Sequence, residues 1–180
     1  AMAALTASLR PDGWGEVARA VMTTDTVPKL AWTRLELGGT VVTLGGVAKG
    51  AGMIAPDMAT LLAFVCTDAR VDSNVLRHWV QVGADRSFNA VTVDGDTSTN
   101  DTLLVLAGGA AANPMIGAVE SEDGRRFGDA LGAVLLDLAL QIVADGEGAT
   151  KLIHIRVTGA PDRSSARRVA FTVANSPLVK

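Results

Sequence analysis

The stretch WTRLELGGTVVTLGGV, residues 32–47, has the pattern of a β-hairpin. Apolar and β-branched residues recur on both sides of Gly38-Gly39, and a two-residue glycine loop accommodates the positive φ angles of a tight hairpin turn. The sequence therefore predicts paired strands at residues 32–37 and 40–47.

Further elements follow on both sides of this hairpin. Short apolar runs at 60–66 and 103–107 predict buried strands, and the alternating run at 152–157 predicts another. Helices are expected at 13–22 (capped by Asp12), 72–88, 125–144 and 162–174. Several strands are apolar on both faces, which indicates an α/β fold whose sheets are covered by helices or by a second sheet.

Composition limits the class of protein. The 180 residues are 48% hydrophobic and 19% charged, with a net charge of −3, so we expect residues 1–180 to form a single globular domain and not a disordered chain. Without a basic face or polybasic run, no nucleic-acid or membrane partner is predicted. No signal peptide is visible, and no apolar run approaches the roughly 20 residues that span a bilayer. Cys66 is the single cysteine, which fits a reducing, cytoplasmic location.

The segment before Thr60 indicates reactive chemistry. Gly50 and Gly52 permit unusual backbone angles and Pro56 restricts one, so the loop can hold a strained peptide bond next to the threonine hydroxyl. Such a hydroxyl can attack the preceding carbonyl in an N-to-O acyl shift. The α-amine released by hydrolysis, with a pKa near 8, can then act as a general base for the same hydroxyl. On residue type alone, the favoured interpretation is that Thr60 simply begins a β-strand, which threonine favours.

Several motifs in order carry a family resemblance. The run KGAGMIAPDMATLL (49–62) resembles the self-cleavage motif of ornithine acetyltransferases, also called glutamate N-acetyltransferases. Matching segments cover nearly the whole chain in the family's order: MTTDTVPK (22–29), VDGDTSTNDT (93–102), DGEGATK (145–151) and VANSPLVK (173–180). One departure is Asp57, where many members carry asparagine.

The resemblance implies a reaction. The chain would cut itself between Ala59 and Thr60, giving an N-terminal fragment (1–59) and a C-terminal fragment (60–180) that stay together, and Thr60 would be the nucleophile. Thr60 would take acetyl from N-acetylornithine, release ornithine, and pass the acetyl group to glutamate. Some members also accept acetyl-CoA as donor; no cofactor and no metal are implied.

The resemblance also implies a fold and a site. The family fold is an αββα sandwich similar to N-terminal-nucleophile hydrolases. Substrate contacts would fall on Thr23, Lys49 and Glu147 besides Thr60, with lysine suited to a substrate carboxylate and glutamate to an ornithine ammonium group. Taken singly, Thr23 could cap a helix, and Lys49 and Glu147 could be solvated surface residues. The family's oxyanion hole and further contacts would lie outside this chain, so we expect the central portion of a longer enzyme, assembled as a heterotetramer of two cleaved pairs.

Other residues give weaker signals of a site. Residues 45–50 lack the Gly-Lys-Ser/Thr of a phosphate-binding loop, and His78 and His154 lack metal-ligand spacing. Cys66 is expected to be a structural cysteine. The acidic group Asp94, Asp96 and Asp101 lacks the spacing of a calcium loop and is better explained by turn hydrogen bonds.

Other functions stay open at this point. A related self-processed amidohydrolase or aminopeptidase would pass the acyl group to water, and a paralogue of secondary metabolism would prefer another amine. An unprocessed homologue would be a binding module without catalysis.

Overall fold

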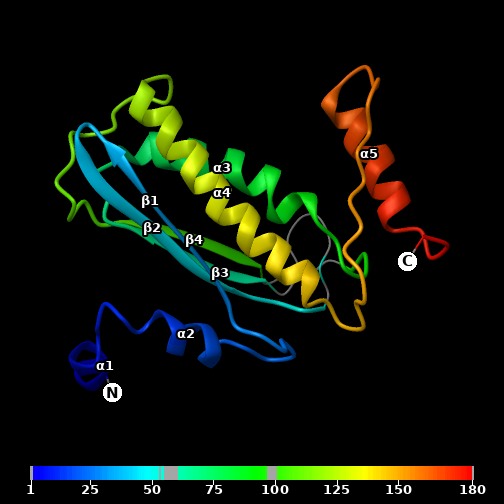
Figure 1. Cartoon of the computed structure of the whole chain (residues 1–180), viewed down its shortest axis with the longest axis horizontal. Helices are drawn as coiled ribbons and strands as arrows, with labels where there is room; N and C mark the ends of the chain where they lie inside the picture. The colour runs from blue at the N-terminus through cyan, green and yellow to red at the C-terminus, as the bar shows by residue number, and fades with distance from the viewer. Residues whose placement is uncertain (1, 53, 55–60, 97–100, 180) are drawn as a thin grey trace.

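The computed structural model describes residues 2–52, 54, 61–96 and 101–179, and only the backbone of residues 3–5. Its strands form one four-stranded sheet in the order β1-β2-β3-β4. The strands are β1 (Lys29–Leu37), β2 (Thr40–Lys49), β3 (Leu62–Thr67) and β4 (Thr102–Ala107). The β1–β2 and β2–β3 pairs are antiparallel, and β3–β4 is parallel. Figure 1 shows the sheet with α3 and α4 over one face.

The predicted hairpin is confirmed. Leu37 pairs with Thr40 across the Gly38-Gly39 loop, and both glycines have positive φ angles, 54° and 78°. These angles suit a tight hairpin turn and strain any residue with a Cβ. The hairpin is longer than predicted. At the end away from the turn, β1 already begins at Lys29 and β2 extends to Lys49.

The helices are α1 (Met2–Ala7), α2 (Trp14–Ala20), α3 (Ser73–Arg86), α4 (Glu122–Ala144) and α5 (Arg163–Ala174), with a 3-10 turn, η1, at Phe88–Ala90. Asp72, Ser121 and Asp162 each accept a hydrogen bond from a first-turn N–H of α3, α4 and α5. The predicted cap of α2 is wrong: Gly13 occupies the cap position without a side-chain bond. Asp12 instead forms an ion pair with Arg10, N–O 3.3 Å.

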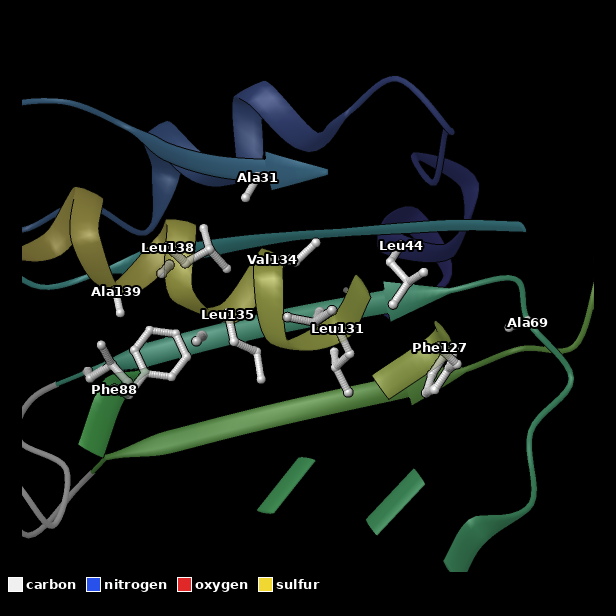
Figure 2. Close-up of a cluster of buried hydrophobic side chains, with 14 of the residues drawn as sticks. Ala31, Leu44, Ala69, Phe88, Phe127, Leu131, Val134, Leu135, Leu138 and Ala139 are labelled. Carbon is white, nitrogen blue, oxygen red and sulfur yellow. The ribbon is translucent and has the colours of Figure 1, made fainter. Parts of the chain in front are cut away.

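The core lies between the sheet and α4. Figure 2 shows Leu131, Leu135 and Leu138 of α4 pointing toward the strands, with Phe88 and Ala139 beside them. The three leucines are fully buried. At roughly 2 kcal/mol for each buried leucine, this seam is a main stabilising contribution.

Close packing of α3 on α4 depends on two glycines. A Cβ at Gly128 of α4 would lie 2.2 Å from the Trp79 ring, and one at Gly83 of α3 would lie 2.6 Å from Leu135 Cδ1. Both distances are well inside van der Waals contact, so a larger residue at either position would displace the Trp79 ring or the Leu135 side chain from its packed position.

Helix α4 also has the length and hydropathy of a membrane-spanning segment, with 23 residues and a mean hydropathy of 1.7 in its most apolar window. Of that window, 44% is buried inside the molecule. Its apolar residues therefore have an alternative partner in the sheet, as in the core helix of a packed domain.

The opposite face of the sheet is partly covered. Short helix α2 packs on β1 and β2 and buries Ala18 completely. Beyond α2, Trp32, Leu104 and Leu106 stay 70%, 43% and 52% exposed. The predicted α/β class is thus confirmed as a sheet packed against helices, whereas the second sheet of the expected sandwich is not among the described residues.

The strand predicted at 152–157 is wrong. These residues have no regular structure and are mostly exposed. Alternation alone does not make a strand, since the backbone also needs a neighbour to bond with; the described portion of the chain places none beside this run. The run leads instead to α5, which Figure 1 shows standing apart from the sheet.

Candidate active site

The predicted site residues come from segments that meet at one end of the sheet. Lys49 ends β2 and pairs with Leu62, the first residue of β3. Leu62 pairs in turn with Thr102, the first residue of β4. Figure 1 shows the C-terminal end of α4 and the start of β1 at this same end. Residues 23, 49, 101 and 147, remote in sequence, are thereby brought to one region.

The predicted nucleophile Thr60 and its partner Ala59 lie outside the described residues. Leu61, the next residue, is held on both sides: its N–H donates to Asp101 Oδ1 at 2.7 Å, and its carbonyl accepts from the Thr102 N–H at 2.9 Å. The backbone of Leu61 is therefore anchored to the start of β4.

Lys49 is the most unusual charge in this region. It is only 8% exposed, and its Nζ donates to the hydroxyl of exposed Thr23 at 3.3 Å. Among the described residues, no carboxylate lies within ion-pair distance of Lys49. The charge of Asp101 acts on Lys49 without a direct ion pair, so the buried ammonium group is only partly compensated. It is therefore suited to receive an anion, such as a carboxylate, from solution.

Glu147 is tied to the loop after Lys49, with no hydrogen bond or ion pair to Lys49 among the described residues. Its N–H donates to the Ala51 carbonyl at 2.7 Å. Its carboxyl group lies so close to Gly52 that a Cβ there would be 2.9 Å from Glu147 Cδ. The side chain is exposed and borders a groove of about 980 Å³ between α4 and α5. The structure thus unites Thr23 with Lys49, and places Glu147 on the neighbouring backbone.

A buried ionic cluster lies under these residues, and sequence analysis missed it. Lys29 Nζ donates to Asp25 Oδ1 at 2.7 Å and to Asp145 Oδ2 at 2.6 Å. The Lys29 and Asp25 side chains are fully buried, and that of Asp145 is 5% exposed. All three belong to motif segments already singled out. The pairing of Lys29 with Asp145 spans 116 residues and leaves no signal in a single sequence.

The two carboxylates of this cluster are strongly held in the charged form. Burial alone would raise the pKa of Asp145, but hydrogen bonds from Lys29 and Thr26 lower it to about 2. Burial likewise opposes ionisation of Asp25, and N–H bonds from Gly50 and Thr23, together with Lys29, keep the Asp25 pKa below its usual value. Hydrogen bonding and charge outweigh desolvation at both sites.

Asp101 behaves in the opposite way. Burial raises the pKa of Asp101, although the Leu61 N–H and the charge of Lys49 work against that rise. Its Oδ2 atom is buried and has no hydrogen-bond partner among the described residues. Asp101 was predicted only as part of a turn. Asp94 fits that prediction, since its Oδ1 accepts from the Asp96 N–H at 3.0 Å, whereas Asp101 accepts the Leu61 N–H.

The remaining candidates fall away from this site. Gly45 and Gly46 lie inside β2 and so form no phosphate loop. Exposed His78 packs edge-on against Trp79, with ring centroids 5.0 Å apart. Burial raises the pKa of the half-buried thiol of Cys66, which makes it a poorer nucleophile. Within the described ranges, no group of three His, Cys, Asp or Glu residues could hold a metal ion.

Comparison with known proteins bears on the whole chain. The sequence model of the ArgJ family matches residues 1–180. The "Arginine biosynthesis bifunctional protein ArgJ" of Symbiobacterium thermophilum is 57% identical over 98% of this chain and 44% of its own length. The protein of the same name from Gluconobacter oxydans is 52% identical over 100% of this chain and 42% of its own length. This chain thus spans less than half the length of these relatives.

A solved structure agrees with the sequence match. The crystal structure of arginine biosynthesis bifunctional protein ArgJ from Bacillus halodurans is 45% identical, with a TM-score of 0.60. It covers 63% of this chain, and 53% of that chain is matched. On the family match over every residue, this chain belongs to the ArgJ family.

Proposed function

We propose that this chain carries the acyl-transfer site of an ornithine acetyltransferase, with Thr60 as nucleophile. The acetyl group of N2-acetylornithine would pass to glutamate through an acetyl-threonine intermediate, in arginine biosynthesis in the cytoplasm. The observation that carries this proposal is the buried Lys49 ammonium, bonded only to the Thr23 hydroxyl among described residues, at the end of the sheet where Leu61 follows Thr60.

Maturation would begin with an N-to-O shift. The Thr60 hydroxyl oxygen attacks the Ala59 carbonyl carbon, an ester forms, and the Ala59–Thr60 peptide bond breaks. Water then hydrolyses the ester, leaving a carboxylate on Ala59 and a free α-amine on Thr60. This amine, with an ordinary pKa near 8, can take the proton of its own hydroxyl.

Turnover would then proceed in two half-reactions. The Thr60 oxygen attacks the acetyl carbon of N-acetylornithine, the amide bond breaks, and the proton from the hydroxyl leaves with ornithine. The amine of glutamate next attacks the acetyl ester, and the Thr60 oxygen departs and regains a proton. Both substrates carry a carboxylate that suits Lys49, and only ornithine carries a second amine that suits Glu147.

The fold supports the proposal that the two fragments stay together after cleavage. The N-terminal fragment contains β1 and β2, whereas the C-terminal fragment contains β3, β4, α3 and α4. β2 and β3 pair from Leu44–Thr67 to Lys49–Leu62, and α4 packs on β1 and β2. One core is thus shared by both fragments, and separating them would expose it to water.

The exposed apolar face supports the proposed αββα sandwich. Trp32, Leu104 and Leu106 stand on the side of the sheet away from α4, and a second sheet packed there would bury them. A heterotetramer of two cleaved pairs remains part of the same proposal.

The complete enzyme provides the test. Denaturing mass spectrometry of the wild type should show two fragments split before Thr60, and Thr60→Ala should stay intact. Acetyl transfer from N-acetylornithine to glutamate should be lost in Thr60→Ala, and the acetyl-CoA donor can be tried in the same assay.

Matched controls separate the alternatives. Thr172→Ala, at an exposed hydroxyl of α5 that bonds to the Arg168 carbonyl, should be cut and stay active. Release of acetate independent of glutamate would favour an amidohydrolase, and an uncut wild type that binds ornithine without turnover would favour a binding module. Wild-type transfer without cleavage would refute the mechanism.

A further inference from the structure

The cluster of Asp25, Lys29 and Asp145 connects three of the four predicted substrate contacts, namely Thr23, Lys49 and Glu147. Asp25 reaches two of them through the backbone: its Oδ2 accepts from the Thr23 N–H at 3.1 Å, and its Oδ1 accepts from the Gly50 N–H at 2.7 Å. Thr23 and the residue before Gly50, which is Lys49, are the pair that meets at the site. One carboxylate therefore fixes the two segments that carry this pair.

Asp145 makes the corresponding connection to Glu147. It accepts hydrogen bonds from the N–H and hydroxyl groups of Thr26, with the N–H bond 2.9 Å long, and it forms an ion pair with Lys29. Two residues further on, the Glu147 N–H bonds to the Ala51 carbonyl. The segment 145–147 is thereby anchored at one end to the cluster and at the other to the loop after Lys49.

The N–H group that Asp25 accepts belongs to Gly50, a residue with an unusual backbone conformation. Its φ angle is 149°, a conformation that residues with a Cβ rarely adopt. The Asp25 carboxylate holds the N–H of this residue within the buried region. Without that acceptor, the backbone that follows Lys49 would lose this hydrogen bond and the orientation of the lysine would be less restricted.

Stability alone is a weak explanation for the cluster. A buried ion pair is often no more stabilising than apolar residues of the same volume, because desolvation offsets the attraction. Apolar residues, however, could not accept the N–H groups of Thr23 and Gly50. We propose that Asp25, Lys29 and Asp145 are positioning residues that set Thr23, Lys49 and Glu147 for substrate binding; this rests on the proposed function.

The two carboxylates should have different effects on the two substrates. Asp25 supports Thr23 and Lys49, which would serve the carboxylate common to N-acetylornithine and glutamate. Asp145 supports Glu147, which would serve the side-chain amine that only the ornithine substrate carries. Asp25→Asn should therefore raise KM for both substrates, and Asp145→Asn should raise KM mainly for N-acetylornithine.

The experiment measures KM and kcat separately in the complete enzyme carrying Asp25→Asn, Asp145→Asn or the control Asp68→Asn. Asp68 also accepts a strand N–H, that of Thr43 at 2.7 Å, but at the other end of β2. Roughly tenfold increases in KM are expected for the two cluster variants, the effect of losing about one charge-assisted hydrogen bond. Asp68→Asn should leave both KM values within about twofold of wild type.

A readout independent of activity keeps the two proposals distinguishable. Amide hydrogen exchange at Gly50 should accelerate in Asp25→Asn and stay unchanged in Asp68→Asn, even if the enzyme proves to transfer a different group. Unchanged KM values together with an unchanged Gly50 exchange rate in folded Asp25→Asn would overturn the positioning role. Equal losses in Asp68→Asn would overturn it as well, because the effect would then be general destabilisation. If wild type fails to transfer acetyl while Gly50 still responds, only the proposed function is lost.

Discussion

Two groups of charged residues at the same end of the sheet differ in how completely their charges are paired. In the closed cluster of Asp25, Lys29 and Asp145, Lys29 has a carboxylate on each side, at 2.7 and 2.6 Å. In the open cluster of Thr23, Lys49 and Asp101, the lysine bonds to a neutral hydroxyl. One oxygen of Asp101 has no partner among the described residues. Buried charges that are fully paired have a structural role, whereas buried charges without a full set of partners can bind a ligand.

The largest expected effect comes from opening the closed cluster. Lys29→Met removes the shared cation and leaves two buried carboxylates facing each other, so the free energy of unfolding should fall by about 3–5 kcal/mol. Equilibrium unfolding in urea measures this loss. A loss below about 1 kcal/mol would mean that Lys29 is no more important to stability than a surface ion pair.

The same substitution at Lys49 should have the opposite balance of effects. Lys49→Met removes a buried charge that has no carboxylate within ion-pair distance in the described ranges and that acts on Asp101 only without direct contact, so stability should change by about 1 kcal/mol or less. Loss of the cation that would bind substrate should lower kcat/KM for acetyl transfer by about 100-fold. The paired measurements on Lys29→Met and Lys49→Met sharpen the comparison, and equal stability losses would contradict it.

A smaller effect is expected from pH. The pKa of Asp145 is about 2 in the folded protein, below its usual value of 3.8. The folded state therefore favours the charged form. The stability from this lowered pKa, on the order of 2 kcal/mol, is present above pH 3.8 and is lost as pH falls toward 2.

Asp101 should show the reverse dependence, because its pKa is raised. Its contribution is present below pH 3.8, the usual value, and is lost as pH rises through the folded pKa. Unfolding midpoints between acid and neutral pH should thus converge for wild type and Asp145→Asn on acidification. For Asp101→Asn, any gain over wild type should appear only on the neutral side. Parallel curves for both variants would show that neither carboxylate is coupled to folding.

Much of the fold could be predicted from local pattern. The Gly38-Gly39 hairpin, the strands of the sheet and the long helix α4 were each expected close to their observed positions. Each of these elements buries one apolar face, so apolar residues recur along its sequence with the period of a helix or a strand. The run 152–157 has the same kind of period but lacks a neighbouring strand in the described chain, so the prediction failed there.

The candidate site was only partly predictable. Motif resemblance pointed to Thr23, Lys49 and Glu147, and the structure brings the first two into contact. It gave no role to Asp25, Lys29, Asp101 or Asp145. The sequence of a motif does not distinguish a charged residue that is solvated from one that is buried in an ion pair or buried without a direct partner of opposite charge.

The sequence alone predicts the α/β class, the hairpin and the family of this chain. Periodic apolar residues and motifs in a fixed order can both be recognised along a sequence without knowledge of its tertiary contacts. Which charges neutralise each other was decided only by the tertiary structure. Asp145 lies 116 residues from Lys29, and only the packing of α4 across the sheet removes the water that would otherwise screen them. Lys29 forms ion pairs with two carboxylates, whereas Lys49 bonds to a neutral hydroxyl. This difference is therefore a property of the folded molecule.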